Sequence, residues 1–226
     1  MPLEADHAMV LNVDYDVVQV TLLSLYVSGC ATLLGSAIGI PLGALIGLRE
    51  FGGKGLLKTI TYTMYGFPPV VAGLAIYYLF SRAGPFGSFG ILFTPTAMIL
   101  AETLLVIPLT TGITITSVAE VDRPIKETVK SLGTTPRQSV LTVMREAWVG
   151  LVMAAMIGFG RCIAEVGAAF MVGGNIKGET RVLTTAIMFE TRQGHFDYAL
   201  GLGLVLITVA MAVFFFLRLL QEKELL

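Results

Sequence analysis

Long apolar runs and short polar segments alternate along this chain. The runs predict about five membrane spans, at roughly residues 17–48, 59–80, 93–118, 147–172 and 198–218. Each run can cross a hydrocarbon core of about 30 Å at a rise of about 1.5 Å per residue. The first run is longer than a span requires, so we expect its helix to tilt or to project into water. The pattern predicts an all-α integral membrane protein in which residues 1–226 form a single transmembrane domain.

The polar segment from Val121 to Glu146 has the pattern of two short helices. Asp122 can cap the first helix, Pro124 is tolerated in its opening turn, and Gly133 can end it. The apolar face of this helix would consist of Ile125, Val129 and Leu132. The segment is therefore predicted to be a docking element, and the alternative is an ordinary loop.

The second helix of this segment has a clear start signal. Thr135 and Gln138 have the spacing of a capping box, and Pro136 lies at the first helical position. An apolar face would continue into the next span through Val140, Val143 and Met144. A helix, a glycine turn and a second helix are thus expected over residues 121–146.

The distribution of Lys and Arg predicts the orientation. With the N-terminus outside, the basic residues on the cytoplasmic side are Arg49, Lys54, Lys58, Arg123, Lys126, Lys130, Arg137, Arg145, Arg218 and Lys223. Those on the outer side are Arg82, Lys177, Arg181 and Arg192, and Arg161 lies within a span. Short loops rich in Lys and Arg remain in the cytoplasm, so the segment 121–146 and the C-terminus are predicted to be cytoplasmic.

Small residues and prolines mark several of the runs. The first run carries a small residue at every fourth position, namely Ala31, Gly35, Gly39, Gly43 and Gly47, which favours close helix packing over a substrate role. Prolines are expected to interrupt the runs at Pro41, at Pro68 and Pro69, and at Pro95 and Pro108. Such breaks favour a protein with a pathway, although they can also serve packing alone.

Three ionisable residues fall inside the runs. Arg161 and Glu165 are four positions apart, so we expect them to share a helix face and to neutralise one another, in a structural or a transport role. Glu102 has no partner on its own helix and is expected near Arg161 or protonated by burial. Hydroxyl groups in the third run could line an aqueous path or bond their own helix, and these belong to Thr103, Thr110, Thr111 and Thr114.

The polar segment between the fourth and fifth runs, residues 173–196, is too short and too polar to span. Gly173, Gly174 and Asn175 predict a turn, Thr180 is expected to cap a short helix, and Gly194 should end it. The helix would carry Leu183, Ile187 and Thr191 on one face. Lys177 and Arg181 favour an anion nearby, with lipid headgroups or water as the alternative. A re-entrant or surface helix at the outer mouth is expected, and Thr184 and Thr185 in it are candidate pathway or gate residues.

Composition and charge exclude several classes of protein. Hydrophobic residues make up 55% of the chain and the mean hydropathy is +0.80, too apolar for a soluble domain. The formal net charge is -1 and the basic residues form no continuous patch, so no nucleic-acid partner is expected. The spacing of cysteines and histidines predicts no disulfide, metal site or other cofactor. The acidic segment before the first run lacks the basic region of a cleavable signal.

Catalytic motifs are absent from the sequence. The nearest approach to a phosphate-binding loop is at Gly53 and Lys54, where Leu48 stands at the first glycine position and Gly55 at the hydroxyl position. No hydrolase or metalloprotease motif occurs. The chain is therefore not expected to be an enzyme, although an acid-base site at Glu102 or Glu165 is an alternative.

The segment 121–146 resembles the EAA loop of permease subunits in ATP-binding-cassette importers. That pattern is Glu-Ala-Ala, three residues, Gly, nine residues and Ile-x-Leu-Pro, and here Glu127, Gly133 and Val143 match it while Thr128 and Val129 replace the alanines. Arg145 and Glu146 replace the Leu-Pro. The resemblance implies a type I importer permease fold and a loop that docks on a cytoplasmic ATPase subunit. The implied coupling residues are Glu127, Lys130, Gly133, Thr135, Arg137 and Gln138.

The remainder of the chain resembles tungstate importer permeases, and more distantly those for molybdate and sulfate. The resemblance is carried by residues 67–108 and 159–187 and covers nearly everything from the first run onward. It implies a homodimer in the inner membrane of a prokaryote, surrounded by lipid, that receives a tetrahedral oxyanion from an extracytoplasmic binding protein. The candidate pathway or gate residues are Glu102, Thr110, Arg161, Glu165, Gly173, Asn175, Thr184 and Thr185. A membrane scaffold for a cytoplasmic partner is the alternative from another class.

Overall fold

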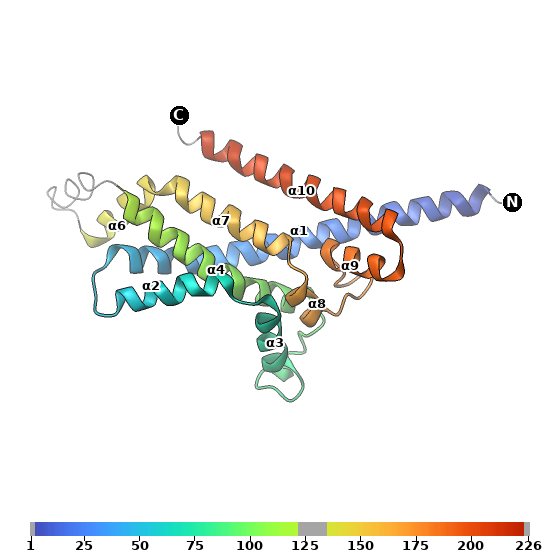
Figure 1. Cartoon of the computed structure of the whole chain (residues 1–226), viewed down its shortest axis with the longest axis horizontal. Coiled ribbons are helices and arrows are strands. Elements are labelled where there is room, and N and C mark those ends of the chain that lie inside the picture. Colours follow the sequence, from blue (N-terminus) through green and yellow to red (C-terminus); the bar gives the residue numbers. More distant parts are fainter. Residues whose placement is uncertain (1–2, 122–134, 224–226) are drawn as a thin grey trace. The chain divides into compact units, whose positions relative to one another are not determined.

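The computed structural model describes residues 3–121 and 135–223, and within them the side chains of residues 16–121, 135, 138–219 and 221. All regular structure in these ranges is helical (Figure 1), which confirms the predicted fold class. The helices are α1 (Leu3–Leu48), α2 (Lys54–Thr63), η1 (Met64–Gly66), α3 (Pro69–Phe80), η2 (Gly87–Phe89), α4 (Pro95–Glu120), α6 (Pro136–Glu146), α7 (Trp148–Ile163), α8 (Gly167–Gly173), α9 (Leu183–Gln193) and α10 (Phe196–Lys223).

Three helical stretches of the described residues are long and apolar enough to cross a membrane: Asp16–Leu48, Pro95–Glu120 and Phe196–Leu219. Two bent helix pairs raise the number to five if each pair counts as one span. Lys54–Gly66 and Pro69–Phe80 meet at 96°, and Gln138–Glu146 and Trp148–Ile163 meet at 69°. The second apolar run is therefore a sharply bent element, and helix α7 covers only part of the fourth.

The prediction that every proline interrupts its run is wrong. Pro41 and Pro108 lie inside the continuous helices α1 and α4, and Pro95 is the first residue of α4. A single proline removes one hydrogen bond, and a long packed helix can tolerate that loss. The consecutive prolines at 68 and 69 do break the second run, because each restricts the residue before it to extended backbone. Phe67 has the extended ψ of 123° that this restriction requires.

The chain divides into two compact units, to each of which α1, α4 and α10 contribute residues. Unit 1 comprises Met1–Cys30, Pro69–Glu102 and Ile163–Val213. Unit 2 comprises Ala31–Pro68, Thr103–Cys162 and Phe214–Leu226. The candidate functional residues fall in both, and each unit is described in turn.

In unit 2, the small-residue stripe of α1 is a packing surface against α4, as predicted. A side-chain carbon at Gly39 would overlap the Oγ1 atom of Thr110, and one at Gly35 would lie 2.5 Å from Cβ of Val106. Gly43 and Gly47 are blocked in the same way by α4. The Thr110 hydroxyl donates a hydrogen bond to the Gly35 carbonyl oxygen at 3.2 Å, which ties the two backbones together. Only glycine permits this approach.

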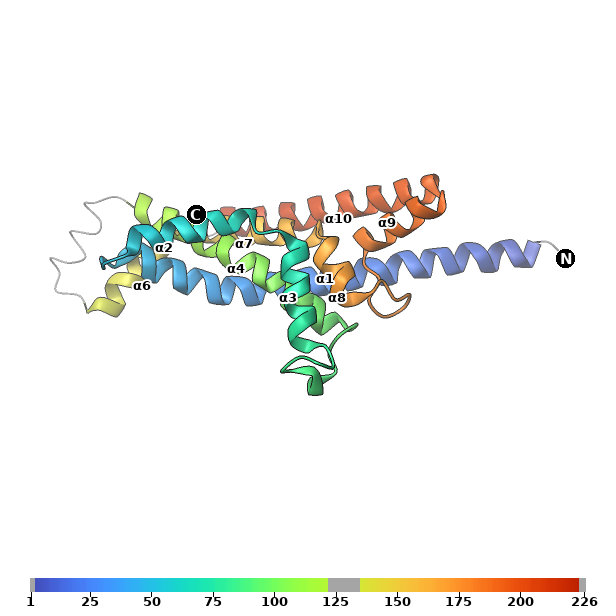
Figure 2. The ribbon, with the colours of Figure 1, turned by 60° about the horizontal axis from the view of Figure 1, so that its bottom comes forward.

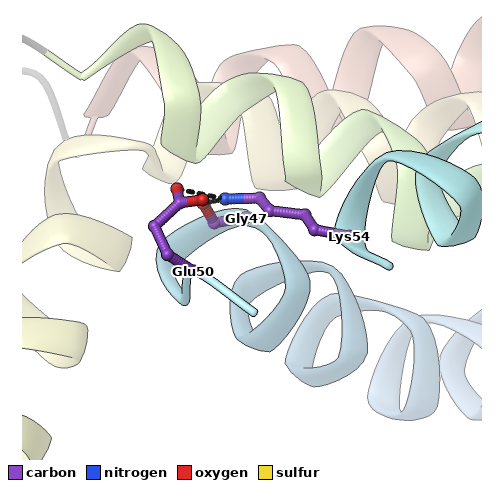
Figure 3. A network of polar contacts seen from close by, with 3 residues as sticks. All are labelled: Gly47, Glu50 and Lys54. Atoms are coloured by element: carbon purple, nitrogen blue, oxygen red, sulfur yellow. Dashed lines mark hydrogen bonds and ion pairs between the residues drawn. The ribbon is translucent and has the colours of Figure 1, made fainter. Parts of the chain in front are cut away.

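The turn from α1 to α2, also in unit 2, is held by Lys54 (Figure 3). Its Nζ atom donates to the Gly47 carbonyl oxygen at 3.1 Å and to Oε1 of Glu50 at 2.7 Å. Gly47 lies in the last turn of α1, where carbonyl oxygens have no partner in the helix and a cation is favourable. The hydrogen bond and the positive charge of Lys54 lower the pKa of the Glu50 carboxyl. Lys54 therefore fixes where α2 starts.

In unit 1, α3 packs against α8, two short helices that lie side by side in Figures 1 and 2. A side-chain carbon at Gly73 of α3 would lie 3.0 Å from Cα of Ala168, so the two helices approach closely. A second contact joins α1, α9 and α10 through the buried residues Val20, Leu183, Ala186 and Leu202. These contacts hold α8 against α3, and α9 against α1 and α10.

Candidate functional site

Helix α6, in unit 2, begins as the sequence predicts. The Thr135 backbone N–H donates to Oε1 of Gln138 at 2.9 Å, and the Gln138 N–H donates to the Thr135 hydroxyl at 3.4 Å. These two bonds form the predicted capping box, and Pro136 follows at the first helical position. The start of the helix that is expected to meet a partner is thereby fixed by local contacts alone.

The other coupling residues expected from the sequence are only partly described. Glu127, Lys130 and Gly133 lie outside the described residues, as does the predicted first helix of that segment. Arg137 is part of α6, but its side chain is outside the described side chains. Their contacts with a partner stay a prediction.

One face of α6 is anchored in unit 2 by Val143. This side chain is 4% exposed and packs with Val118 of α4 and with Ala147, while Leu48 of α1 and Val121 pack against the same cluster. Of the predicted apolar face, Val140 instead lies on the exposed side of α6, next to Leu141, which is 65% exposed. Helix α6 therefore contacts the ends of α1 and α4 and continues, after a bend, into α7.

The prediction that Arg161 and Glu165 share one helix face is wrong, whereas their mutual neutralisation stays a prediction. Helix α7 ends at Ile163, and Glu165 lies in the connection to α8. Its Oε1 atom accepts a hydrogen bond at 3.1 Å from the Ala168 N–H in the first turn of α8. The carboxylate thus satisfies an N–H group that a helix start leaves without a partner, and a short second helix becomes possible. Arg161 is a residue of unit 2.

The start of α9 is also different from the prediction. Its first residue is Leu183, and Thr180 does not cap it. The Leu183 N–H donates to the hydroxyl of Ser24 on α1 at 2.8 Å, and the Val182 N–H donates to the Thr185 hydroxyl at 3.1 Å. Ser24 was missed by sequence reasoning, since its only signal is a hydroxyl within an apolar run. A side chain from α1 therefore provides the cap that the local sequence lacks.

Thr180 closes the turn between α8 and α9 instead. Its hydroxyl donates to the Gly173 carbonyl oxygen at 2.6 Å and accepts from the Ile176 N–H at 2.9 Å. Gly174 and Asn175 both have positive φ, +74° and +54°, which confirms the predicted turn. Oδ1 of Asn175 is buried and has no hydrogen-bond partner among the described residues. At the other end of α9, Gly194 has φ of +85° and ends the helix as predicted.

The structure gathers five of the eight candidate pathway residues into the segment 165–185 of unit 1. These are Glu165, Gly173, Asn175, Thr184 and Thr185, and the Thr184 hydroxyl donates to the Glu165 carbonyl oxygen at 2.7 Å. Glu102, 2% exposed, is in α4, one turn after the Met98 side chain that packs against Gly173. Thr110 belongs to unit 2, where its hydroxyl bonds α1 and its own helix.

Replacing Thr184 by valine tests whether this bond holds the segment together. The change keeps the side-chain shape and leaves the Glu165 carbonyl oxygen without its donor, so we expect a loss of about 1 kcal/mol in the free energy of unfolding. Thr191→Val is the matched control, because the exposed Thr191 bonds only the Ile187 carbonyl oxygen of its own helix. Unfolding in detergent should show a shift for the first variant alone, and equal shifts would contradict this role.

Comparison with known proteins identifies a matching family, similar permease proteins and a similar solved structure. Residues 39–223 match the family described as binding-protein-dependent transport system inner membrane component. A probable anion ABC transporter permease protein of Haloferax volcanii is 39% identical over 208 residues, covering 90% of this chain and 89% of the relative. A tungstate uptake system permease protein of Peptoclostridium acidaminophilum is 39% identical over 218 residues, 96% of each chain. In the inward-facing structures of the MetNI methionine ABC transporter, a chain with 19% identity superposes with a TM-score of 0.75, covering 93% of this chain and 96% of that one.

Proposed function

The chain belongs to the family of binding-protein-dependent transport system inner membrane components, and from this premise we propose that it is the permease subunit of an ATP-driven tungstate importer. The assignment of tungstate as the substrate is supported by the similarity to a tungstate uptake permease, which is 39% identical over 96% of both chains. Molybdate and sulfate are the alternatives, because these oxyanions resemble tungstate in shape and charge.

The proposed energy source is a cytoplasmic ATPase subunit that docks on α6. Three features of α6 support this role: its start is fixed by the capping box of Thr135 and Gln138, Val143 anchors it, and Leu141 is exposed. A helix held in this way can transmit the movement of a docked partner to the helices that it contacts. The proposal places α6 and the C-terminus on the cytoplasmic side and the segment 173–196 on the outer side, in agreement with the distribution of Lys and Arg.

A second copy of the chain and an extracytoplasmic binding protein complete the proposed importer in a prokaryotic inner membrane. The binding protein would supply most of the selectivity, because a pathway that bound a dianion tightly would not release it. The residues proposed for the pathway or its gate are Glu102, Thr110, Arg161, Glu165, Gly173, Asn175, Thr184 and Thr185. Among them, Glu165 accepts a hydrogen bond from the Ala168 N–H through its carboxylate and one from the Thr184 hydroxyl through its carbonyl oxygen, which holds these two residues in the segment 165–185.

Reconstitution tests this function. The tagged chain, purified with its ATPase and inserted into vesicles with its binding protein, should accumulate tungstate only when ATP is present on the ATPase side. Titration of the binding protein with tungstate, molybdate and sulfate by calorimetry then tests the substrate. Equal affinity for all three would remove the assignment to tungstate. Failure to co-purify any ATPase would contradict the importer role itself.

A further inference from the structure

Unit 1 contains a pocket of about 150 Å³ that the proposed pathway does not use. Its lining includes charged and polar residues of three helices and one turn: Asp16 and Gln19 of α1, Lys177 and Arg181 of the turn before α9, Glu190 of α9, and Tyr198 of α10. Helix α9 lies next to α1 and the first turns of α10 in Figures 1 and 2. The pocket has room for the end of a side chain or a small molecule, not for a folded element.

Several polar and charged groups of this pocket already have partners. Nζ of Lys177 lies 2.6 Å from Oδ2 of Asp16, and the amide of Gln19 donates to the Gly178 carbonyl oxygen at 2.9 Å. Glu190 contacts Nδ1 of His195 at 2.8 Å. These contacts hold the polar part of the lining, and Val20, Ala186 and Leu202 form its apolar part.

Arg181 is the exception among these charges. Its guanidinium lies 4.6 Å from the centre of the Phe189 ring, which holds the group in place, and the buried Nε–H has no hydrogen-bond partner among the described residues. A buried donor without an acceptor is costly, and native proteins rarely leave one unless something else supplies the acceptor. Arg181 also lines the pocket, where its guanidinium can donate charge-assisted hydrogen bonds to a carboxylate.

We propose that this pocket receives one carboxylate side chain of the extracytoplasmic binding protein, which pairs with Arg181. The inference rests on the proposed function, which places this end of unit 1 on the outer side and requires that partner. The charges in the pocket favour a single negative charge: one carboxylate compensates Arg181, whereas a second negative charge would meet only Lys177, which is already paired with Asp16. The small volume excludes the bulk of a lipid.

The test is the concentration of binding protein that half-maximally stimulates ATP hydrolysis by the reconstituted importer. Arg181→Gln should raise it about tenfold, as expected for the loss of a charge-assisted pair worth about 1.4 kcal/mol. Arg181→Lys keeps the charge without the planar fork and should give a smaller rise. Arg192→Gln is the matched control, because this exposed arginine of α9 does not line the pocket, and it should change the value less than twofold.

A second variant is expected to change the half-maximal concentration of binding protein in the opposite direction. It distinguishes a role of the pocket in binding from a role in supporting the fold. Asp16→Asn removes a negative charge from the pocket and releases Lys177, so it should lower the half-maximal concentration, whereas damage to the fold would raise it. An unchanged value in Arg181→Gln would overturn the proposal, as would a rise in both variants. Loss of a retained phospholipid from Arg181→Gln in native mass spectrometry, with stimulation unaltered, would assign the pocket to lipid instead. If no binding protein stimulates ATP hydrolysis by the wild-type importer, the proposed function itself is contradicted, and the proposed occupant of this pocket is contradicted as a consequence.

Discussion

Replacing Gly39 by alanine is expected to destabilise the folded protein by about 3 kcal/mol, because the new methyl group would overlap the Thr110 hydroxyl and approach the backbone of α4. Neither neighbour can give way easily. The Ile107 carbonyl oxygen is backbone, and the Thr110 side chain is fully buried and bonded to Gly35. The two helices would therefore have to separate along the whole stripe.

The measurement is the midpoint of unfolding in detergent, followed by loss of helical signal. Gly29→Ala is the control on the same helix, since a side-chain carbon there meets nothing within 4 Å. It should shift the free energy of unfolding by less than about 0.5 kcal/mol. A Gly39 variant as stable as the wild type would show that α1 and α4 do not pack this closely.

Replacing Val143 by aspartate is expected to reduce uptake at least tenfold while the associated ATPase still hydrolyses ATP. Val143 is buried where α6 meets α4, in a cluster that also contacts Leu48 of α1, and an unpaired charge there costs several kcal/mol. The charge would detach α6 from the bundle. On the proposed docking of the ATPase to α6, the bound partner could then move without moving the helices that α6 contacts.

Two further variants keep this prediction falsifiable. Val143→Ala weakens the anchor with a smaller loss of buried area and should give partial uptake with a lower ratio of substrate to ATP. Leu141→Asp places the same charge on the exposed side of the same helix, so the anchor stays intact and the effect should fall on retention of the ATPase during purification. The Val143→Asp variant could instead lose the ATPase during purification, while the complexes that remain transport as much substrate per ATP as the wild type. That result would show that Val143 does not couple ATP hydrolysis to transport.

Several features of the fold could be predicted because their causes are local. The Thr135–Gln138 capping box depends on two residues one turn apart, and Gly194 ends α9 because only a few residue types tolerate its positive φ. The glycine stripe of α1 was predictable as a packing surface because glycines at every fourth position share one side of a helix.

Other features were predicted incorrectly because distant residues decide them. Arg161 and Glu165 have the spacing of neighbours on one helix face, yet helix α7 ends at Ile163 and the Glu165 carboxylate accepts a hydrogen bond at the start of α8. Thr180 is a good capping residue by type, but its hydroxyl is engaged with Gly173 across the turn. Local propensity could not reveal either competing partner.

The amino-acid sequence was enough to predict an all-helical membrane protein, since long apolar runs must satisfy their backbone hydrogen bonds internally in lipid. It also determined the family, through the segment 121–146 and the full-length similarity. Three features could be seen only in the folded chain: helix α7 ends at Ile163, Ser24 caps a helix 159 positions away, and Arg181 lies beside a pocket with no acceptor for its Nε–H among the described residues. The reason is physical: a run of residues fixes its own hydrogen-bonding pattern, but the partner of a buried polar group is set by whichever distant segment packs against it.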